Sequence, residues 1–152
     1  MSDIPPKARS IRVLLVDDHA IVRQGLRCTL EAYPGIEVVG EATDGEEVLA
    51  CITKVQPTVV VMDIIMPKMD GIAATRLLKT QHPQVVVVGL TRDLKDYTAY
   101  SMKKAGASEV VDKKNAIPEL YDAIQRALAG IDGKAGGRPE IGPGPDSTTD
   151  AT

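Results

Sequence analysis

The sequence predicts an α/β protein built on a single doubly wound sheet of five parallel strands, a (βα)5 unit. Short runs rich in Val alternate with segments in which apolar residues recur every three or four positions, and this alternation is repeated along the chain. Short apolar runs of this kind are typical of parallel strands that are buried on both faces. Strands that alternate with helices are joined by right-handed crossovers, which place helices on both faces of the sheet.

The expected elements follow one another along the chain. Strands are predicted at residues 11–16, 37–42, 58–62, 85–90 and 109–112. Helices are predicted at residues 20–33, 45–56, 71–81, 95–105 and 117–130. The helix at 95–105 has the weakest apolar stripe, because Tyr and Met alternate there with Lys and Ser. Such looseness fits an element that moves, although a rigid helix with a poor stripe is equally common.

Capping residues define several of the helix boundaries. Pro34-Gly35 ends the first helix, and Pro118 suits the first turn of the last one. Asp44 is expected to cap the second helix, and Glu47, three residues later, to reach back to it as in a capping box. These local signals agree with the apolar periodicity and support the predicted fold.

The composition limits the class of protein. The chain has 152 residues and a net charge of −3, with four Tyr and neither Phe nor Trp, so its core must be aliphatic. This length allows one domain plus short appendages, and the charge gives no support for direct binding of nucleic acid. No signal peptide is recognisable, and no apolar run approaches the roughly 20 residues of a membrane span. We therefore expect a cytoplasmic protein.

A single domain is expected over residues 10–130. Residues 1–9 are polar, contain Pro5-Pro6, and are expected to form a flexible leader. Residues 131–152 are rich in Gly, Pro, Asp, Ser and Thr and lack apolar periodicity, which predicts a linker or disordered tail.

Polar residues stand at the ends of four predicted strands. They are Asp17, Asp18, Asp63, Thr91 and Lys113. Ligands of open α/β sheets gather outside the carboxyl ends of the strands, so these side chains should meet at one edge. Taken singly, each residue could be a helix cap, a turn former or a solvated lysine. Capping does not explain two adjacent carboxylates, because their repulsion raises a pKa unless a cation intervenes.

The residue types in this set suit phosphoryl transfer. Mg²⁺ prefers oxygen ligands in octahedral geometry, and the three carboxylates could supply them. One carboxylate can act as a nucleophile toward phosphorus and form an aspartyl phosphate. The metal ion and a lysine ammonium would neutralise charge on the transferring group, and a hydroxyl could hydrogen-bond a phosphoryl oxygen.

Several ordered motifs carry a resemblance to a known family. They are Val-Leu-Leu-Val-Asp17-Asp18-His19, Val-Val-Gly40-Glu-Ala, Val-Met-Asp63-Ile-Ile-Met-Pro67-Lys-Met-Asp-Gly71, Leu90-Thr91, and Ala105-Gly106-Ala107-Ser with Lys113 beyond it. Together they resemble the receiver (CheY-like) domain of two-component response regulators over residues 10–129. The Asp-Asp-His motif, followed by Arg23, is most similar to the NarL/LuxR-type subgroup. The resemblance implies a flavodoxin-like fold with strand order 2-1-3-4-5.

The resemblance implies a role for each of these residues. Asp63 would be the phosphoacceptor that receives its phosphoryl group from a sensor histidine kinase. Thr91 would be the switch hydroxyl, and Lys113 the phosphate-binding cation. The Mg²⁺ ligands would be the carboxylates of Asp17, Asp18 and Asp63 and the backbone carbonyl of Ile65. Beyond self-phosphotransfer and autodephosphorylation, no enzymatic activity is expected.

Four positions qualify the resemblance. Val110 occupies the place of an aromatic that usually takes part in the switch, and Arg92 follows Thr91 where small residues are common. Arg92 either faces solvent or screens the phosphate. Ile65 is poor at positioning an attacking water, which predicts slow autodephosphorylation. His19 is expected at the edge of the site without a catalytic role.

Three functions remain open from the sequence. The leading one is a phosphoaccepting switch, as the regulatory part of a LuxR-type transcription factor or as a stand-alone receiver that acts through protein contacts. In the first case DNA would be bound only through an effector domain that this chain does not contain, and phosphorylation could drive formation of a homodimer. A pseudo-receiver that takes no phosphate is the second function. The third, a Mg²⁺-dependent phosphatase, is disfavoured because Ile65 stands where such enzymes place a second acid.

Overall fold

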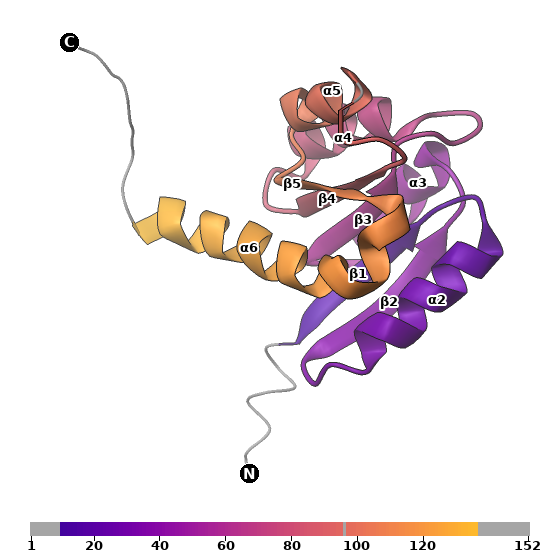
Figure 1. Cartoon of the computed structure of the whole chain (residues 1–152). Coiled ribbons are helices and arrows are strands. Elements are labelled where there is room, and N and C mark those ends of the chain that lie inside the picture. The colour runs from indigo at the N-terminus through magenta and orange to yellow at the C-terminus, as the bar shows by residue number, and fades with distance from the viewer. Residues whose placement is uncertain (1–9, 96, 137–152) are drawn as a thin grey trace.

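The computed structural model describes residues 10–95 and 97–136 of the chain, and it shows one parallel sheet enclosed by helices (Figure 1). The sheet has five strands in the order β2-β1-β3-β4-β5, and every neighbouring pair is parallel. The predicted fold class and strand order are therefore confirmed. The predicted leader at 1–9 and residues 137–152 of the predicted tail lie outside the described residues.

Strands and helices alternate along the chain. The strands are β1 (Ile11–Val16), β2 (Ile36–Ala42), β3 (Val59–Asp63), β4 (Val86–Thr91) and β5 (Glu109–Asp112). The helices are α2 (Ala20–Glu31), α3 (Gly45–Val55), α4 (Gly71–Gln81), α5 (Tyr97–Ala105), the short 3₁₀ turn η1 (Lys113–Asn115) and α6 (Ala116–Gly136).

The strands carry a separate apolar core on each face. Along β1, Val13 and Leu15 point into the core formed with α2 and α6, and Leu14 and Val16 point into the core formed with α3, α4 and α5. All four of these side chains are buried. Because successive strand residues face opposite sides, a strand covered on both faces must be apolar at every position. This requirement accounts for the continuous Val-rich runs of the sequence.

Two predicted helix ends were wrong. Helix α2 ends at Glu31, two residues early, and Tyr33 instead stacks on Tyr121 with ring centroids 3.8 Å apart. The helix stops because Pro34 disfavours helical geometry in the residue before it. Helix α6 runs through Gly130 to Gly136, so residues 131–136 of the predicted tail are helical. A Gly inside a helix costs about 1 kcal/mol relative to Ala but does not by itself end the helix.

The predicted cap of α3 is present with one change. The side chain of Asp44 accepts from the amide of Glu47 at 2.9 Å, as expected. The Glu47 carboxylate reaches one residue further back than predicted and accepts from the amide and the hydroxyl of Thr43 at 2.6 and 2.9 Å. A Thr hydroxyl before the cap offers Glu47 a second donor, so two of its hydrogen bonds go to the same residue.

Strand β2 contains a bulge that changes the direction of its last side chains. Val13 of β1 pairs with Val38, but Leu14 pairs with Gly40, so Val39 is an extra residue. Side chains beyond a one-residue bulge face the side opposite to the one they would otherwise take. Glu41 therefore lies on the face that α2 covers.

None of the helices in residues 10–95 and 97–136 is both long and apolar enough to cross a bilayer.

Candidate functional site

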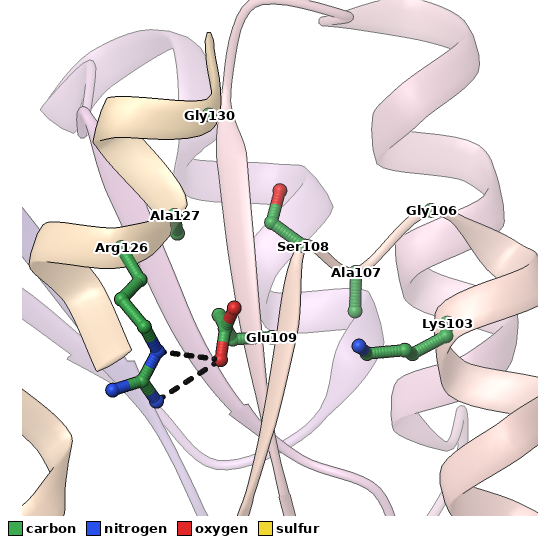
Figure 2. Close-up of a pocket in the computed structure, with 8 residues that line it drawn as sticks. All are labelled: Lys103, Gly106, Ala107, Ser108, Glu109, Arg126, Ala127 and Gly130. Atoms are coloured by element: carbon green, nitrogen blue, oxygen red, sulfur yellow. Dashed lines mark hydrogen bonds and ion pairs between the residues drawn. The ribbon is translucent and has the colours of Figure 1, made fainter. Parts of the chain in front are cut away.

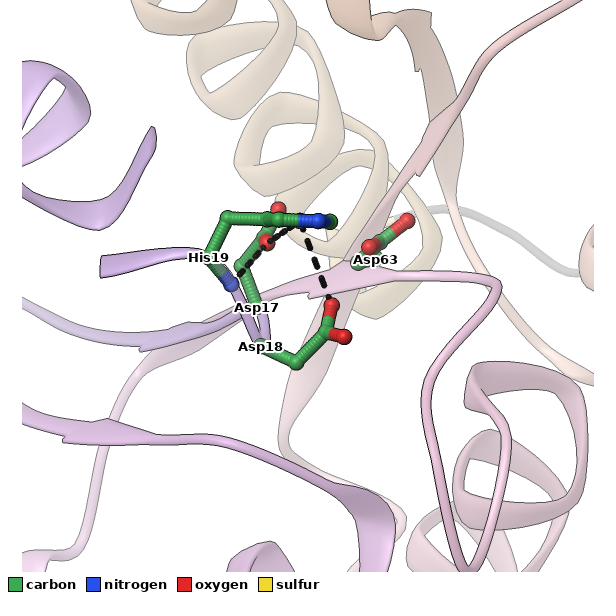
Figure 3. Close-up of side chains that lie close together, drawn as sticks. All are labelled: Asp17, Asp18, His19 and Asp63. Atoms are coloured by element: carbon green, nitrogen blue, oxygen red, sulfur yellow. Dashed lines mark hydrogen bonds and ion pairs between the residues drawn. The ribbon is translucent and has the colours of Figure 1, made fainter. Parts of the chain in front are cut away.

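The structure brings the acidic residues of the strand ends together. Asp17 and Asp18 follow β1, and Asp63 is the last residue of β3, the strand next to β1. One carboxylate oxygen from each of these three residues and one ring nitrogen of His19 lie within 4.8 Å of one another (Figure 3). The predicted convergence at the carboxyl edge of the sheet is therefore observed.

Lys113 connects two of these carboxylates. Its Nζ lies 2.8 Å from Oδ2 of Asp17 and 2.9 Å from Oδ2 of Asp63. Asp17 and Asp63 are only 1% and 3% exposed, so both charges are removed from water. A buried carboxylate is tolerated when it is paired, and a single ammonium pairs both of them here.

The pKa values at the site follow from burial and pairing. Burial raises the pKa of Asp63, the Lys113 ammonium opposes this effect, and the negative charge of Asp17 adds to it. Burial alone would lower the pKa of Lys113, but its contacts with Asp17 and Asp63 outweigh burial and raise it. Lys113 is therefore charged at neutral pH, whereas Asp63 is a carboxyl group that gives up its proton less readily than usual.

Neither aspartate after β1 caps the following helix. The N-terminal cap position of α2 is His19, and none of the described side chains hydrogen-bonds there as a cap. Oδ1 of Asp17 instead accepts from the backbone amide of His19 at 2.8 Å. The helix-cap interpretation of this pair is therefore excluded, and both carboxylates stay with the cluster.

His19 lies at the solvent-exposed edge of the cluster and contacts two of its acids. Its Nδ1 is 3.1 Å from Oδ1 of Asp17 and 3.3 Å from Oδ1 of Asp18 (Figure 3). Its position directly after two strand-end acids is the sequence signal that could have placed it there. The side chain is 52% exposed, so it covers the acids from the solvent side.

The oxygen and nitrogen atoms of this cluster could serve as ligands of a hard divalent cation. Oδ2 of Asp17 is buried and, among the described residues, it has an ion pair with Lys113 but no hydrogen bond of acceptable geometry. A buried negative oxygen that accepts no hydrogen bond is favoured by a nearby cation. Closely spaced carboxylate oxygens are the ligands that Mg²⁺ prefers, so the residues present fit this ion.

Thr91, the last residue of β4, is buried, whereas Ile65, two residues after Asp63, is exposed. The Thr91 hydroxyl is buried, donates to the carbonyl of Asp93 and accepts from its amide, each at 3.3 Å. These contacts engage the hydroxyl within its own loop. Ile65 exposes 60% of its surface, and its amide lies 3.4 Å from Oδ1 of Asp63.

Two hollows lie at opposite ends of β5. One, of about 450 Å³, is lined by His19, Val22, Arg92, Lys113 and Lys114, so Arg92 borders the site. The larger one, of about 490 Å³, is lined by residues of α5, β5 and α6 together with the loop before β5 (Figure 2). Its lining includes Ser108, the residue before β5. Because β5 has four residues, its other end lies roughly 13 Å from this point. The larger hollow therefore does not belong to the acidic site.

A comparison with protein families matches residues 13–125 to the response regulator receiver domain. The chain belongs to this family. It is 42% identical over 120 residues to the transcriptional regulatory protein LiaR of Bacillus subtilis, covering 79% of this chain and 57% of LiaR. It is 36% identical over 121 residues to the response regulator protein VraR of Staphylococcus aureus, covering 80% and 58%.

Solved structures show the same relationship. A two-component response regulator of the LuxR family from Aurantimonas sp. SI85-9A1 superposes with a TM-score of 0.75 at 36% identity, covering 88% of this chain and 91% of that one. The non-phosphorylated receiver domain of RcsB from Escherichia coli gives a TM-score of 0.74 at 27% identity, covering 80% and 95%. The chain is thus a receiver domain with relatives among LuxR-family response regulators, and it spans somewhat more than half the length of LiaR and VraR.

Proposed function

We propose that this receiver domain accepts a phosphoryl group on Asp63 from a phosphohistidine of a sensor histidine kinase. The observation that carries the proposal is the contact of Lys113 Nζ with the buried carboxylates of Asp17 and Asp63, at 2.8 and 2.9 Å. An oxygen of Asp63 attacks phosphorus, the bond between phosphorus and the imidazole nitrogen breaks, and the electron pair stays on that nitrogen. The products are an aspartyl phosphate and a free histidine on the kinase.

The charges at the site would support this transfer. The proposed Mg²⁺ ligands are the carboxylates of Asp17, Asp18 and Asp63 and the backbone carbonyl of Ile65. When bound, Mg²⁺ supplies positive charge beside the transferring phosphoryl group. Lys113 supplies a second positive charge and remains paired with Asp17 while the oxygen of Asp63 becomes bonded to phosphorus.

Thr91 would report the new phosphate to α5. Phosphorylation adds roughly −1.5 to −2 charges, which can draw the Thr91 hydroxyl away from Asp93 to donate to a phosphoryl oxygen. The loop that follows Thr91 leads directly into α5, which buries Ala99, Met102 and Ala105. These small or flexible side chains hold the helix less firmly than branched residues would, so α5 is the element we expect to move.

The output would be the regulation of transcription. LiaR is named a transcriptional regulatory protein and VraR a response regulator, and somewhat more than half of the length of each matches this chain. RcsB has been solved as a complex with DNA. We propose that this receiver controls a LuxR-type effector domain that binds DNA, and that phosphorylation promotes a homodimer. A stand-alone receiver that acts through protein contacts is the alternative, and a reading frame that continues into a DNA-binding domain would decide between them.

The proposal is tested with acetyl phosphate and Mg²⁺. Intact mass measurement should show one added phosphoryl group in the wild type, and the adduct should disappear without Mg²⁺ and in Asp63→Asn. Lys114→Ala, beside the critical lysine, serves as the matched control and should keep the adduct. A wild-type chain without an adduct would refute the phosphoacceptor assignment and favour a pseudo-receiver.

A further inference from the structure

Two arginines and one glutamate connect α2 to β2 beside the acidic cluster. Nη1 of Arg23 donates to the backbone carbonyl of Asp17 at 2.6 Å, and Nε of Arg23 donates to Oε1 of Glu41 at 2.7 Å. The second carboxylate oxygen of Glu41 accepts from Nε of Arg27 at 2.9 Å. Both arginines thus contact Glu41, but Arg23 is the one that contacts the loop with the acids.

The bulge in β2 explains why Glu41 is in reach. Without the extra residue Val39, Glu41 would point to the face that α3 and α4 cover. With it, Glu41 pairs with Leu15 of β1 and shares its face with α2. A sequence-local irregularity in one strand therefore places an acid opposite two arginines of a helix.

Arg23 fixes the peptide group between the two aspartates. The amide of Asp17 donates to the carbonyl of Ala42 at 3.1 Å, so β2 already holds one side of this residue. The carbonyl that Arg23 holds belongs to the bond joining Asp17 to Asp18. With both sides held, the directions in which the two carboxylates leave the backbone are set.

The residue types fit a positioning role. A guanidinium offers several donors in a rigid fork, so one Arg23 side chain can bind a carboxylate and a carbonyl together, which a lysine ammonium does less well. The hydrogen bond from Arg23 lowers the pKa of Glu41 more than burial raises it, and Arg27 lowers it further. Glu41 is therefore ionised and balances the guanidinium charge close to a proposed cation site.

We propose that Arg23, held by Glu41, is a positioning residue that orients Asp17 and Asp18 for Mg²⁺. Arg23 does not contact the ion in this scheme and acts through the Asp17 carbonyl. The inference rests on the Mg²⁺ site of the proposed function. Its consequence is that the affinity for Mg²⁺ depends on a side chain outside the acidic cluster.

The test is a Mg²⁺ titration of the ¹⁵N-labelled full chain, followed by NMR through the amides of Asp18 and His19, with no phosphodonor present. Second-sphere partners of metal ligands change affinity by about 10–100-fold, so Arg23→Gln and Arg23→Lys should each weaken Mg²⁺ by about 10-fold or more. Glu41→Gln should weaken it by a smaller factor. Arg27→Gln, which loses contacts to Glu41 and Glu31 but none to the loop, is the matched control and should bind like the wild type.

Unfolding in urea without Mg²⁺ distinguishes a role of Arg23 in orienting the acids from a role in the stability of the fold. The inference expects Arg23→Lys and Arg27→Gln to have similar unfolding midpoints but different Mg²⁺ affinities. Equal affinities in these two variants would overturn it. A wild-type chain that binds no Mg²⁺ would instead overturn the proposed metal site itself. Should Arg23→Gln fail to fold, Arg23→Lys and Glu41→Gln still decide the question.

Discussion

The apolar core and the two acids Asp17 and Asp63 at the edge of the sheet are both almost fully buried but are stabilised in opposite ways. Val61 of β3 and Leu120 of α6 are fully buried, and each removes apolar surface from water at a gain of about 25 cal/mol per Å². Asp63, two residues after Val61, is also almost fully buried, but it carries a carboxyl group. Burial of such a group is unfavourable unless a cation pairs with it.

The burial of these carboxyl groups lowers the stability of the fold, whereas the burial of apolar side chains raises it. The core is supported by many side chains, so that the loss of one leaves the others in place. At the acidic edge, two buried acids share one ammonium, that of Lys113. The edge should therefore respond to pH, to cations and to single charge changes, and the core to none of these.

The largest effect is expected from removing the shared cation. Lys113→Ala leaves Asp17 and Asp63 unpaired in a buried place, and breaking a buried ion pair from one side costs about 3–5 kcal/mol. Urea unfolding at neutral pH measures this change in the free energy of unfolding. Mg²⁺ should restore part of the lost stability, and the neighbouring Lys114→Ala should change it little. A Lys113→Ala protein as stable as the wild type would show that the acids are not ionised together.

A comparable loss with a different signature is expected in the core. Leu120→Ala removes a fully buried side chain and should cost about 2–5 kcal/mol. In contrast to the loss at the acidic edge, this one should be the same with and without Mg²⁺ and across mild pH. Thermal and urea unfolding of the two variants side by side check the contrast. Mg²⁺ rescue of Leu120→Ala would contradict the separation of the two regions.

The pH dependence of stability should come from Asp63. Because its pKa is raised in the fold, the folded chain holds this proton more tightly than the unfolded chain. The resulting stability is fully present below the ordinary value of 3.8 and is lost as pH rises through the higher folded value. Asp63→Asn lacks this loss, so its advantage over the wild type should grow from acidic to neutral pH. Urea midpoints of both proteins across that range test the sign, and an advantage that shrinks with rising pH would refute it.

The smallest effect is expected from an exposed charge pair outside both regions. Arg126 of α6 contacts Glu109 of β5 at 3.1 Å, beside the hollow at the start of β5 (Figure 2). Exposed pairs contribute about 0.2–1 kcal/mol, so Arg126→Gln should change the free energy of unfolding by no more than this. A double-mutant cycle with Glu109→Gln measures the coupling. A larger value would mean that charge pairs matter here even in contact with water.

The parts of the structure that the sequence predicted correctly are those where burial restricts the choice of residues. The strands could be predicted because burial on both faces leaves unbroken apolar runs, and the acids could be grouped because the carboxyl ends of parallel strands share an edge. The roles of Asp63, Thr91 and Lys113 in phosphoryl transfer remain predictions. Only their positions have been observed.

Features that depend on three-dimensional alternatives escaped prediction. The bulge at Val39 has no signal in the apolar pattern, because Val is as suitable for an extra residue as for a paired one. Helix α6 passed Gly130 because propensity is a weak preference that neighbouring residues can override. The position of His19 directly after two acids indicates that it lies near them but not which way its ring turns, so its contacts with both carboxylates were not predicted.

Helix α6 adds a mechanical consequence to the chemistry of the sheet edge. It begins right after the η1 turn, which starts with Lys113, and packs against the sheet as far as Ala127. The last part of its 21 residues continues past the sheet (Figure 1). At 1.5 Å per residue the helix is about 30 Å long, so a tilt of roughly 10° at its start would move its far end by roughly 5 Å. Because Leu120 and Ile124 are fully buried against the sheet, such a tilt would have to carry these core contacts with it.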